Sequence, residues 1–476
     1  MKNAAAALAC VLAALVLAGA ASATTFGVSD DAGKYADDGG AGFFSMLNDL
    51  GMTENRIAVF WDPANPTTIV DQAFLDRSVP QATERGIEVI FAIYPLKARG
   101  LVDTPNGIEL FAQYAAKVAR RYPQVRKIIC LNEGNQPRFH QPQFDAAGNG
   151  VSGAVQEHAM AACYDALKAV DPGLDVIAFG LSPRGNDDFD AESNVSHSPV
   201  RFLREVGDAY RASGRTKPIA DDVSIHCYPN RNTDSPTLGY AWPKIGCVNL
   251  DRLKQAWWDA FHGTGQPLFP EGSSSAGGPF VRIYVDEVGY QARIAPDKTG
   301  LYNGRENVPL VDEATQGSYY AQLIALMACD PDVVLLNFFH AVDERSLAAW
   351  QSGVVLLDGT RRASYDAVKD AIAQNGRCRG APTSWRHAEH VVGAAADFSG
   401  LGRSFLVKAD EGFSYDVSVL RGSKRVTGAR GIGQENTGTL FKLPRLAPAS
   451  YRVVVKLSAE TNAQRTSRFA RSFRVR

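Results

Sequence analysis

Eight short apolar runs recur along the first part of the chain, and longer amphipathic stretches separate them. Most of the runs are continuously apolar and do not alternate, which is typical of strands buried on both faces of a parallel sheet. The predicted strands cover residues 25–29, 55–61, 87–94, 125–133, 174–180, 222–228, 281–287 and 333–339.

The stretches between these runs have helical periodicity, most clearly at 111–122, 155–170 and 317–329. Pro172 and Gly173 follow the second stretch and Pro331 follows the third, where they end a helix and begin a turn. Eight strand–helix units in about 355 residues predict an α/β fold, a (β/α)₈ TIM barrel over residues 24–380. A doubly wound open sheet is the alternative, but it usually has fewer strands, and no G-x-G-x-x-G motif follows the first run.

Residues 381–476 have a different pattern, in which Gly, Pro and Asn separate short apolar runs. This spacing is typical of an all-β sandwich. We therefore expect a small immunoglobulin-like β-sandwich after a boundary near residue 380. Its predicted strands cover residues 404–408, 415–420, 439–443, 451–457 and 473–475.

The charge changes at the same boundary. The chain is 45% hydrophobic and 21% charged, as in globular proteins, and its net charge of -1 gives no global positive field to attract nucleic acid. Residues 381–476 contain 16 Lys and Arg against 7 Asp and Glu, a net charge of +9, which leaves -10 for the rest. This surplus could meet an acidic polysaccharide or cell-wall polymer, although a solvated surface that packs on the barrel is the simpler interpretation.

The N-terminal segment, residues 1–23, has the features of a secretory signal peptide. Lys2 precedes an apolar stretch at 4–20, and Ala21, Ser22 and Ala23 form a small-x-small cleavage site. An uncleaved anchor needs ~20 apolar residues, and no later stretch is long and apolar enough to span a membrane. We therefore expect export, either to the extracellular medium or to the periplasm or cell surface.

The cysteines agree with export. Of the seven in the chain, Cys10 lies in the predicted signal peptide, and six remain. An even number in an exported protein permits disulfides, and proximity favours Cys227 with Cys247 and Cys329 with Cys378. Buried free thiols are the alternative. No C-x-x-C spacing occurs, so neither a zinc ribbon nor a thioredoxin-like site is indicated.

Two predicted strands end in a carboxylate, the fourth at Asn132 and Glu133 and the seventh at Asp286 and Glu287. In a (β/α)₈ barrel the functional residues lie at the C-terminal ends of the strands. Glutamate is depleted in strands, so propensity does not explain its presence there. Two carboxylates facing one cleft suit glycosidic cleavage, because one can protonate the leaving oxygen while the other attacks the anomeric carbon.

This arrangement resembles clan A glycoside hydrolases, retaining (β/α)₈ enzymes that include cellulase-type, β-mannanase-type and β-xylosidase-type families. The resemblance covers residues 24–380. It implies that Glu133 is the acid/base, that Glu287 is the nucleophile, and that the Asn132 amide holds the sugar 2-hydroxyl.

Three further residues match the clan: Arg56 on the second strand, and His226 and Tyr228 at the end of the sixth. The resemblance implies that Arg56 keeps the nucleophile ionised, that His226 shapes the site, and that the Tyr228 hydroxyl holds the nucleophile. Trp61, at the end of the second strand, is expected to form a platform on which a sugar ring stacks.

The sequence departs from the clan in three places. Gly134 stands where many members have proline, Tyr94 and Pro95 stand where a histidine usually follows the third strand, and the eighth run ends in Phe339 and His340 without the usual tryptophan. These departures leave the sugar and the linkage open.

We therefore expect a secreted retaining glycoside hydrolase that cleaves β-glycosidic bonds of an oligo- or polysaccharide by double displacement. It needs neither a metal nor an organic cofactor, and carbohydrate is its expected partner. A non-catalytic carbohydrate-binding barrel and a transglycosylase on the same fold are the alternatives. The acidic pairs at 30–31 and 37–38 could bind Ca²⁺, but they lack EF-hand spacing, and a solvated acidic loop is the preferred interpretation.

Overall fold

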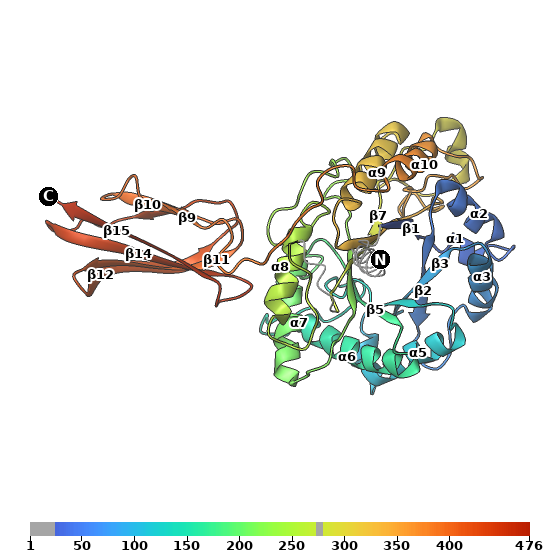
Figure 1. Cartoon of the computed structure of the whole chain (residues 1–476), viewed down its shortest axis with the longest axis horizontal. Coiled ribbons are helices and arrows are strands. Elements are labelled where there is room, and N and C mark those ends of the chain that lie inside the picture. The colour runs from blue at the N-terminus through green and yellow to red at the C-terminus, as the bar shows by residue number, and fades with distance from the viewer. Residues whose placement is uncertain (1–23, 273–278) are drawn as a thin grey trace, which may run out of the picture.

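The protein is described by a computed structural model over residues 24–272 and 279–476; the predicted signal peptide at 1–23 lies outside the described residues. The chain folds into a closed barrel and a smaller β domain that projects from one side of it (Figure 1). Both parts of the predicted fold class are therefore confirmed. Within the described residues, no helix is long and apolar enough to cross a membrane.

Among the described residues, eight parallel strands form the barrel in chain order, and it closes where β1 pairs with β8. Each apolar run predicted from the sequence overlaps one of them. The strands are β1 (Thr25–Ser29), β2 (Glu54–Trp61), β3 (Glu88–Pro95), β4 (Lys127–Cys130), β5 (Asp175–Leu181), β6 (Asp222–His226), β7 (Ile283–Val288) and β8 (Val333–Phe338).

Helices surround the barrel on its outside (Figure 1). In α7, Ser198 caps the first turn by accepting a hydrogen bond from the Arg201 amide, and Gly214 ends the helix at a φ of 69°. The helices are α1 (Ala32–Tyr35), α2 (Ala41–Leu50), α3 (Gln72–Glu84), α4 (Gly100–Asp103), α5 (Gly107–Arg121), α6 (Ser152–Val170), α7 (Pro199–Ser213), α8 (Leu250–Phe261), the 3₁₀ helix η1 (Pro296–Leu301), α9 (Glu313–Met327) and α10 (Ala363–Asn375).

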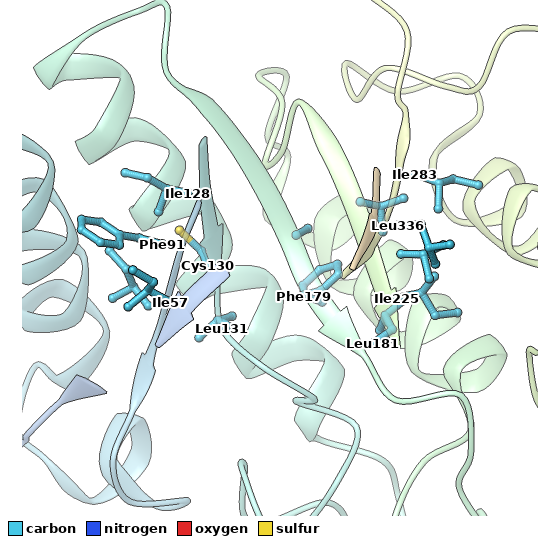
Figure 2. Packing of buried hydrophobic residues seen from close by; sticks show 14 of the residues in the cluster. Ile57, Phe91, Ile128, Cys130, Leu131, Phe179, Leu181, Ile225, Ile283 and Leu336 are labelled. Atoms are coloured by element: carbon cyan, nitrogen blue, oxygen red, sulfur yellow. The ribbon is translucent and has the colours of Figure 1, made fainter. Parts of the chain in front are cut away.

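The main core lies between the strands and the helices. Figure 2 shows part of it, including Phe91 on β3, Ile128 on β4 and Leu336 on β8. Neighbouring residues point to the opposite face of each strand, so Ile90 and Ile129 belong to a second cluster. Because both faces of the strands are packed, the positions of the strand ends are fixed.

The C-terminal domain has two antiparallel sheets, of order β13-β10-β9 and β12-β11-β14-β15. Phe405 and Val407 from the first sheet pack in one cluster with Val453 and Val455 from the second. The strands are β9 (Ala395–Asp397), β10 (Ser404–Lys408), β11 (Phe413–Arg421), β12 (Lys424–Gly433), β13 (Thr439–Lys442), β14 (Ala449–Ala459) and β15 (Thr466–Val475).

Buried ion pairs join this domain to the barrel. The Arg465 Nε atom lies 2.9 Å from Asp259 Oδ1 on α8, and its Nη2 lies 2.7 Å from Glu411 Oε2, with all three side chains buried. Arg252 on α8 adds an ion pair of 2.7 Å to Glu435. Because a buried charge without its partner is strongly destabilising, these contacts hold the domain in one orientation.

One of the two predicted disulfides is present. Cys329 and Cys378 are bonded, whereas the predicted bond between Cys227 and Cys247 is wrong. Both of those cysteines are buried free thiols, and the Cys247 thiol donates to the Cys227 carbonyl oxygen at 3.6 Å. The Cys247 thiol thus has a hydrogen-bond partner, although no disulfide forms.

Candidate active site

The residues after β4 turn sharply into the barrel mouth. Leu131 and Glu133 have φ values of 73° and 41°, in the left-handed region that non-glycine residues rarely adopt. Two backbone hydrogen bonds hold this turn, from the Leu131 amide to Ile93 O at 2.8 Å and from the Glu133 amide to Gly180 O at 2.9 Å. Strained backbone of this kind clusters at functional sites. Here it places Glu133 in the wall of a cavity.

Arg56 on β2 connects β7 and the turn after β4 through one guanidinium group. Its Nε lies 3.0 Å from Asp286 Oδ2, and its Nη1 lies 2.8 Å from Glu287 Oε1 at the end of β7. Its Nη2 donates to Asn132 Oδ1 at 2.5 Å. All four residues are buried. The fork geometry of arginine therefore fixes the predicted nucleophile and the predicted sugar-binding amide together.

His226, the last residue of β6, lies between the two predicted catalytic carboxylates. Its Nδ1 is 2.8 Å from Glu133 Oε1 and 3.3 Å from Glu287 Oε2. Because one atom makes both contacts, those two oxygens lie within about 6 Å of each other, close enough to act on one sugar residue. The other ring nitrogen, Nε2, lies 3.5 Å from Asp286 Oδ2.

The buried charges stabilise one another. Burial alone would lower the pKa of His226, but Glu287 and Asp286 raise it to about 10, so the ring is a cation at neutral pH. Burial also opposes the charge of Asp286, but His226 and Arg56 hold its pKa below the ordinary value. Two cations thus face three carboxylates, and the charges balance when one carboxylate holds a proton.

Tyr228 makes the two predicted catalytic residues unequal. Its hydroxyl donates to Glu287 Oε2 at 2.7 Å, and burial together with the Glu287 charge raises the Tyr228 pKa far above its ordinary value. The phenol therefore stays a donor. Glu287 receives hydrogen bonds or ion pairs from Arg56, Tyr228 and His226, whereas in the described part of the chain the Glu133 carboxylate contacts only His226. Glu287 therefore has more cationic and hydrogen-bonding partners than Glu133 has.

The site opens into two adjoining hollows. The larger, a cavity of about 660 Å³, is lined by both Glu133 and Glu287. The second, of about 430 Å³, is lined by Glu133 but not by Glu287. Tyr228 and Trp350 line both hollows. Glu133 therefore stands at their junction.

Trp350 is a site residue that the sequence reasoning missed. Its ring lies 4.6 Å from the Tyr228 ring and 5.4 Å from the Phe339 ring, centroid to centroid. The end of β8 lacks the tryptophan that is usual in the clan. Trp350 lies 12 residues beyond the end of β8, and its indole lines the cavity instead. A tryptophan in a long loop after a barrel strand was the available signal.

Trp61 does not have the role predicted for it. Its side chain is fully buried, packs against Phe111, and donates its indole N–H to Pro66 O at 3.3 Å. It therefore has no face open to a sugar. Strand alternation explains the result, because Phe60, the next residue back, lines the cavity in its place.

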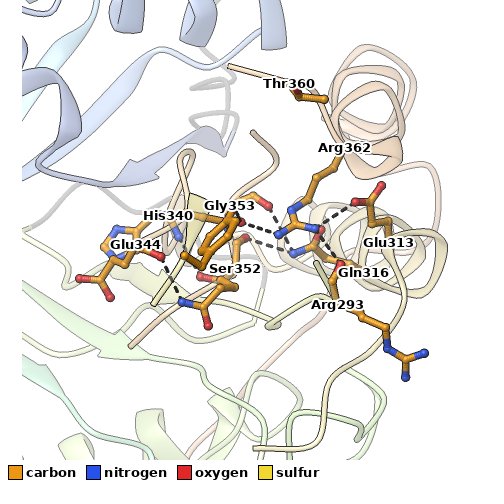
Figure 3. A network of polar contacts seen from close by, with 12 residues as sticks. Arg293, Glu313, Gln316, His340, Glu344, Ser352, Gly353, Thr360 and Arg362 are labelled. Atoms are coloured by element: carbon orange, nitrogen blue, oxygen red, sulfur yellow. Dashed lines mark hydrogen bonds and ion pairs between the residues drawn. The ribbon is translucent and has the colours of Figure 1, made fainter. Parts of the chain in front are cut away.

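Polar contacts fix the loop after β8 that contains Trp350 (Figure 3). Arg362 forms an ion pair with Asp343 in this loop and a second one, of 3.0 Å, with Glu313 on α9. The Ser352 hydroxyl accepts from the His340 amide at 3.1 Å, and Ser352 O accepts from Gln316 at 3.3 Å. The loop is thus held to the barrel at several points.

The acidic loop after β1 is only partly solvated, which corrects the sequence-based interpretation. Asp37 and Asp38 are exposed, but Asp30 is buried and accepts hydrogen bonds from the amides of Ala341 and Val342 at 2.9 and 3.0 Å. Burial raises the pKa of Asp30, although its backbone partners lower it. Asp30 therefore joins the β1 loop to the β8 loop. Within residues 24–272 and 279–476, no group of three or more His, Cys, Asp or Glu side chains has an arrangement that could hold a metal ion.

Packing bears on one departure from the clan. A Cβ atom at Gly134 would overlap the Gln156 side chain on α6, so the proline found in many members would require that side chain to move.

A comparison with models of protein families finds no match, and a search of curated proteins finds none either. Solved structures do match. A family 39 glycoside hydrolase from the gut symbiont Bacteroides cellulosilyticus superposes with a TM-score of 0.50 and 15% identity over 89% of this chain and 80% of its own. A family 5 enzyme of Streptomyces cattleya, GH5_18, solved with GlcNAc, gives 0.50 and 14% identity over 76% and 82%. Identities this low show the fold alone. The chain thus has glycoside hydrolases of families 39 and 5 among its structural neighbours, and it shares their fold.

Proposed function

We propose that this chain is a retaining glycoside hydrolase that cleaves β-glycosidic bonds by double displacement. The proposal rests on the position of His226, whose contacts limit the Glu133–Glu287 oxygen separation to about 6 Å. Retaining enzymes place the two carboxyl groups ~5–5.5 Å apart, and inverting enzymes place them ~6.5–9.5 Å apart to admit a water. The limit favours the retaining arrangement.

In the first step, a Glu287 oxygen forms a bond to the anomeric carbon while the bond to the leaving oxygen breaks. Glu133 gives its proton to that oxygen. The ion pair with Arg56 and the hydrogen bond from Tyr228 keep Glu287 ionised before the attack. The product of this step is a glycosyl ester on Glu287.

In the second step, Glu133 takes a proton from a water, whose oxygen attacks the anomeric carbon and displaces Glu287. Glu287 loses its charge while the ester exists. Arg56 keeps its contact with the ionised Asp286 throughout, so the buried guanidinium is never without an anion. We assign Asp286 this supporting role.

Asn132 is oriented for sugar binding. Because its Oδ1 accepts from Arg56 Nη2, its Nδ2 is the amide atom left to donate toward the cavity that Asn132 lines. A donor there can hold a sugar hydroxyl, and a bond to the 2-hydroxyl strengthens in the transition state of such enzymes.

Each of the two hollows binds a different part of the substrate. The sugar that is attacked must reach both carboxylates, so it occupies the cavity of about 660 Å³. The leaving group needs only the proton of Glu133, so it extends into the hollow of about 430 Å³. Trp350 lines both and offers an aromatic face where the two parts of the substrate meet.

A panel of fluorogenic β-glycosides tests this proposal, with proton NMR of the first product to read its anomeric configuration. We expect hydrolysis of at least one glycoside with the β configuration retained, and no turnover by Glu287→Gln. An α-configured first product would overturn the retaining mechanism. Saturable binding of oligosaccharides without turnover would identify a carbohydrate-binding barrel instead. Transfer to added acceptor sugars in place of water would identify a transglycosylase.

Export is part of the proposal. It is supported by the signal-like sequence at 1–23 and by the Cys329–Cys378 disulfide, since disulfides persist in oxidising compartments. Expression of the full chain, followed by mass spectrometry of the exported product, should find an N-terminus at Thr24. A product that stays inside the cell with residues 1–23 intact would contradict export.

A further inference from the structure

The outer face of the four-stranded sheet is unusually basic. Side chains alternate along each strand, so the residues that share a face can be read from the pairing register. On β14, Val453 and Val455 are buried toward the other sheet, whereas Arg452 and Lys456 are exposed on the outer side. The residues paired with Arg452 and Lys456 therefore share the outer face.

The outer residues form rows across the sheet. One row contains Arg430, Asp416, Lys456 and Arg468, and another contains Arg425, Leu420, Arg452 and Ser472. Between them lies a row of small residues, Gly428, Ser418, Val454 and Ala470, and Arg474 lies opposite Ser450 beyond the second row. The face thus presents six Arg and Lys side chains and one carboxylate.

That carboxylate is already shared. Asp416 lies 2.7 Å from Arg430 and 3.5 Å from Arg425. The other four cations have no ion pair with any described residue: Arg452, Lys456, Arg468 and Arg474. Lys456 and Arg468 face each other directly across β14 and β15, and like charges in that position destabilise a sheet. Asp416, opposite Lys456 on β11, offsets only part of this repulsion because it is also paired with Arg430, and an anionic partner would offset the rest.

The face is open to an extended partner. The β domain projects from the barrel, and β12 and β14 lie on the side away from β9 and β10 (Figure 1). Arg452 and Lys456 are four residues apart along β14, or about 13 Å, and small side chains fill the row between them. The result is an exposed row of uncharged side chains with cations on both sides of it.

We propose that this outer face binds a linear acidic polysaccharide, whose carboxylate or sulfate groups pair with Arg452, Lys456, Arg468 and Arg474. Four cations spread over three rows of one exposed face match a polymer that carries many anions along its length. Nucleic acid is the weaker fit, because no aromatic side chain is exposed on this face for bases to stack on. The choice of a glycan rests on the proposed function of the barrel, since a second binding site raises the effective concentration of polymer at the cleft.

The test uses the full chain and two fourfold variants with equal charge change. The first replaces Arg452, Lys456, Arg468 and Arg474 with Gln. The matched control replaces Arg403, Lys408, Lys442 and Arg445 with Gln, four exposed cations that lie on or beside the other sheet. Binding to polygalacturonate and to chondroitin sulfate is measured, with methyl-esterified polygalacturonate as the uncharged polymer. Circular dichroism checks that both variants are folded.

We expect wild type to bind at least one acidic polymer, with affinity that falls as salt rises. The outer-face variant should bind at least tenfold more weakly, the control variant should stay within twofold, and the esterified polymer should not bind. Equal losses in both variants, equal binding of the esterified polymer, or tighter binding of oligo(dT) or phosphatidylserine vesicles would overturn the proposal. Binding needs no turnover, so this result and the hydrolysis result can fail separately.

Discussion

Arg56 Nη1 lies 2.8 Å from Glu287 Oε1, and this contact joins β2 to β7 across the barrel mouth. The same guanidinium group contacts Asp286 and Asn132, so a single side chain orients three residues of the proposed site. An ammonium group presents a compact charge and cannot reproduce this fork.

Arg56→Lys should therefore lower kcat by about 100-fold, because one or more of the three contacts is lost while the charge remains. KM should change less than kcat. Steady-state kinetics on the best glycoside and a thermal melt give the two readouts. Arg138→Lys is the matched control, since Arg138 lines the same cavity but forms no ion pair in the described residues, and it should stay near wild type. An Arg56→Lys kcat within threefold of wild type would count against the role given to this contact.

Glu133→Ala should affect substrates according to their leaving groups. Poor leaving groups need the proton of Glu133, so kcat should fall by about 10²–10⁴-fold on them and much less on a dinitrophenyl glycoside. The basic limb of the pH–rate profile should flatten, and added azide should restore turnover on the activated substrate. An unchanged pH profile would remove Glu133 from the acid/base role.

Trp350→Ala should weaken substrate binding. Loss of the aromatic face at the junction of the two hollows should raise KM by about tenfold, equivalent to ~1.4 kcal/mol, while kcat changes less. Trp258→Ala is the control, because its ring stacks on His262 and His387 away from the cleft. That variant should lower the melting temperature without changing KM. Equal KM values for wild type and Trp350→Ala would exclude contact with the substrate.

The stability of the barrel should depend on the charge of His226. Its pKa is raised to about 10 in the folded protein, chiefly by Glu287 and Asp286 acting against burial, from an ordinary value near 6.5. Between pH 6.5 and 10, His226 therefore keeps its proton in the folded state and has lost it in the unfolded state. The stabilisation should be complete below about pH 6.5 and disappear as the pH rises through 10.

Urea unfolding between pH 6 and 10.5 measures this effect. Wild type should lose free energy of unfolding across that range, and His226→Gln, if it folds, should lose less of it. If His226→Gln does not fold, NMR titration of the wild-type His226 ring gives the pKa directly. A ring that titrates near 6.5 would contradict the charge balance described for the site.

The barrel could be predicted because burial on both strand faces leaves long apolar runs in the sequence. The C-terminal sheet was harder. β12 contains three glycines and several cations, and both of its faces are largely exposed, so no apolar pattern indicates a strand. It exists because β11 pairs with it along the whole edge, from Phe413 opposite Gly433 to Arg421 opposite Lys424.

The strand-end residues of the site could be predicted, but the loop residues could not. Glu133, Glu287, His226 and Tyr228 meet because parallel strands bring their C-terminal ends to one edge, and the long side chain of Arg56, near the start of β2, reaches Glu287. Trp350 and Asp30 reach the same cavity through loops whose conformation depends on long-range contacts, such as Asp30 with the Ala341 amide. The prediction for Trp61 failed because successive side chains at a strand end point to opposite faces, so an error of one residue places the side chain on the wrong face.

The most direct measurement is covalent trapping of the proposed nucleophile. A 2-deoxy-2-fluoro β-glycoside with a dinitrophenyl leaving group slows both steps but leaves the ester formed, and peptide mass spectrometry locates the label. The account predicts one fluoroglycosyl group per chain on Glu287, and no label on Glu287→Gln. A label on a different side chain, together with full activity of Glu287→Gln, would contradict it.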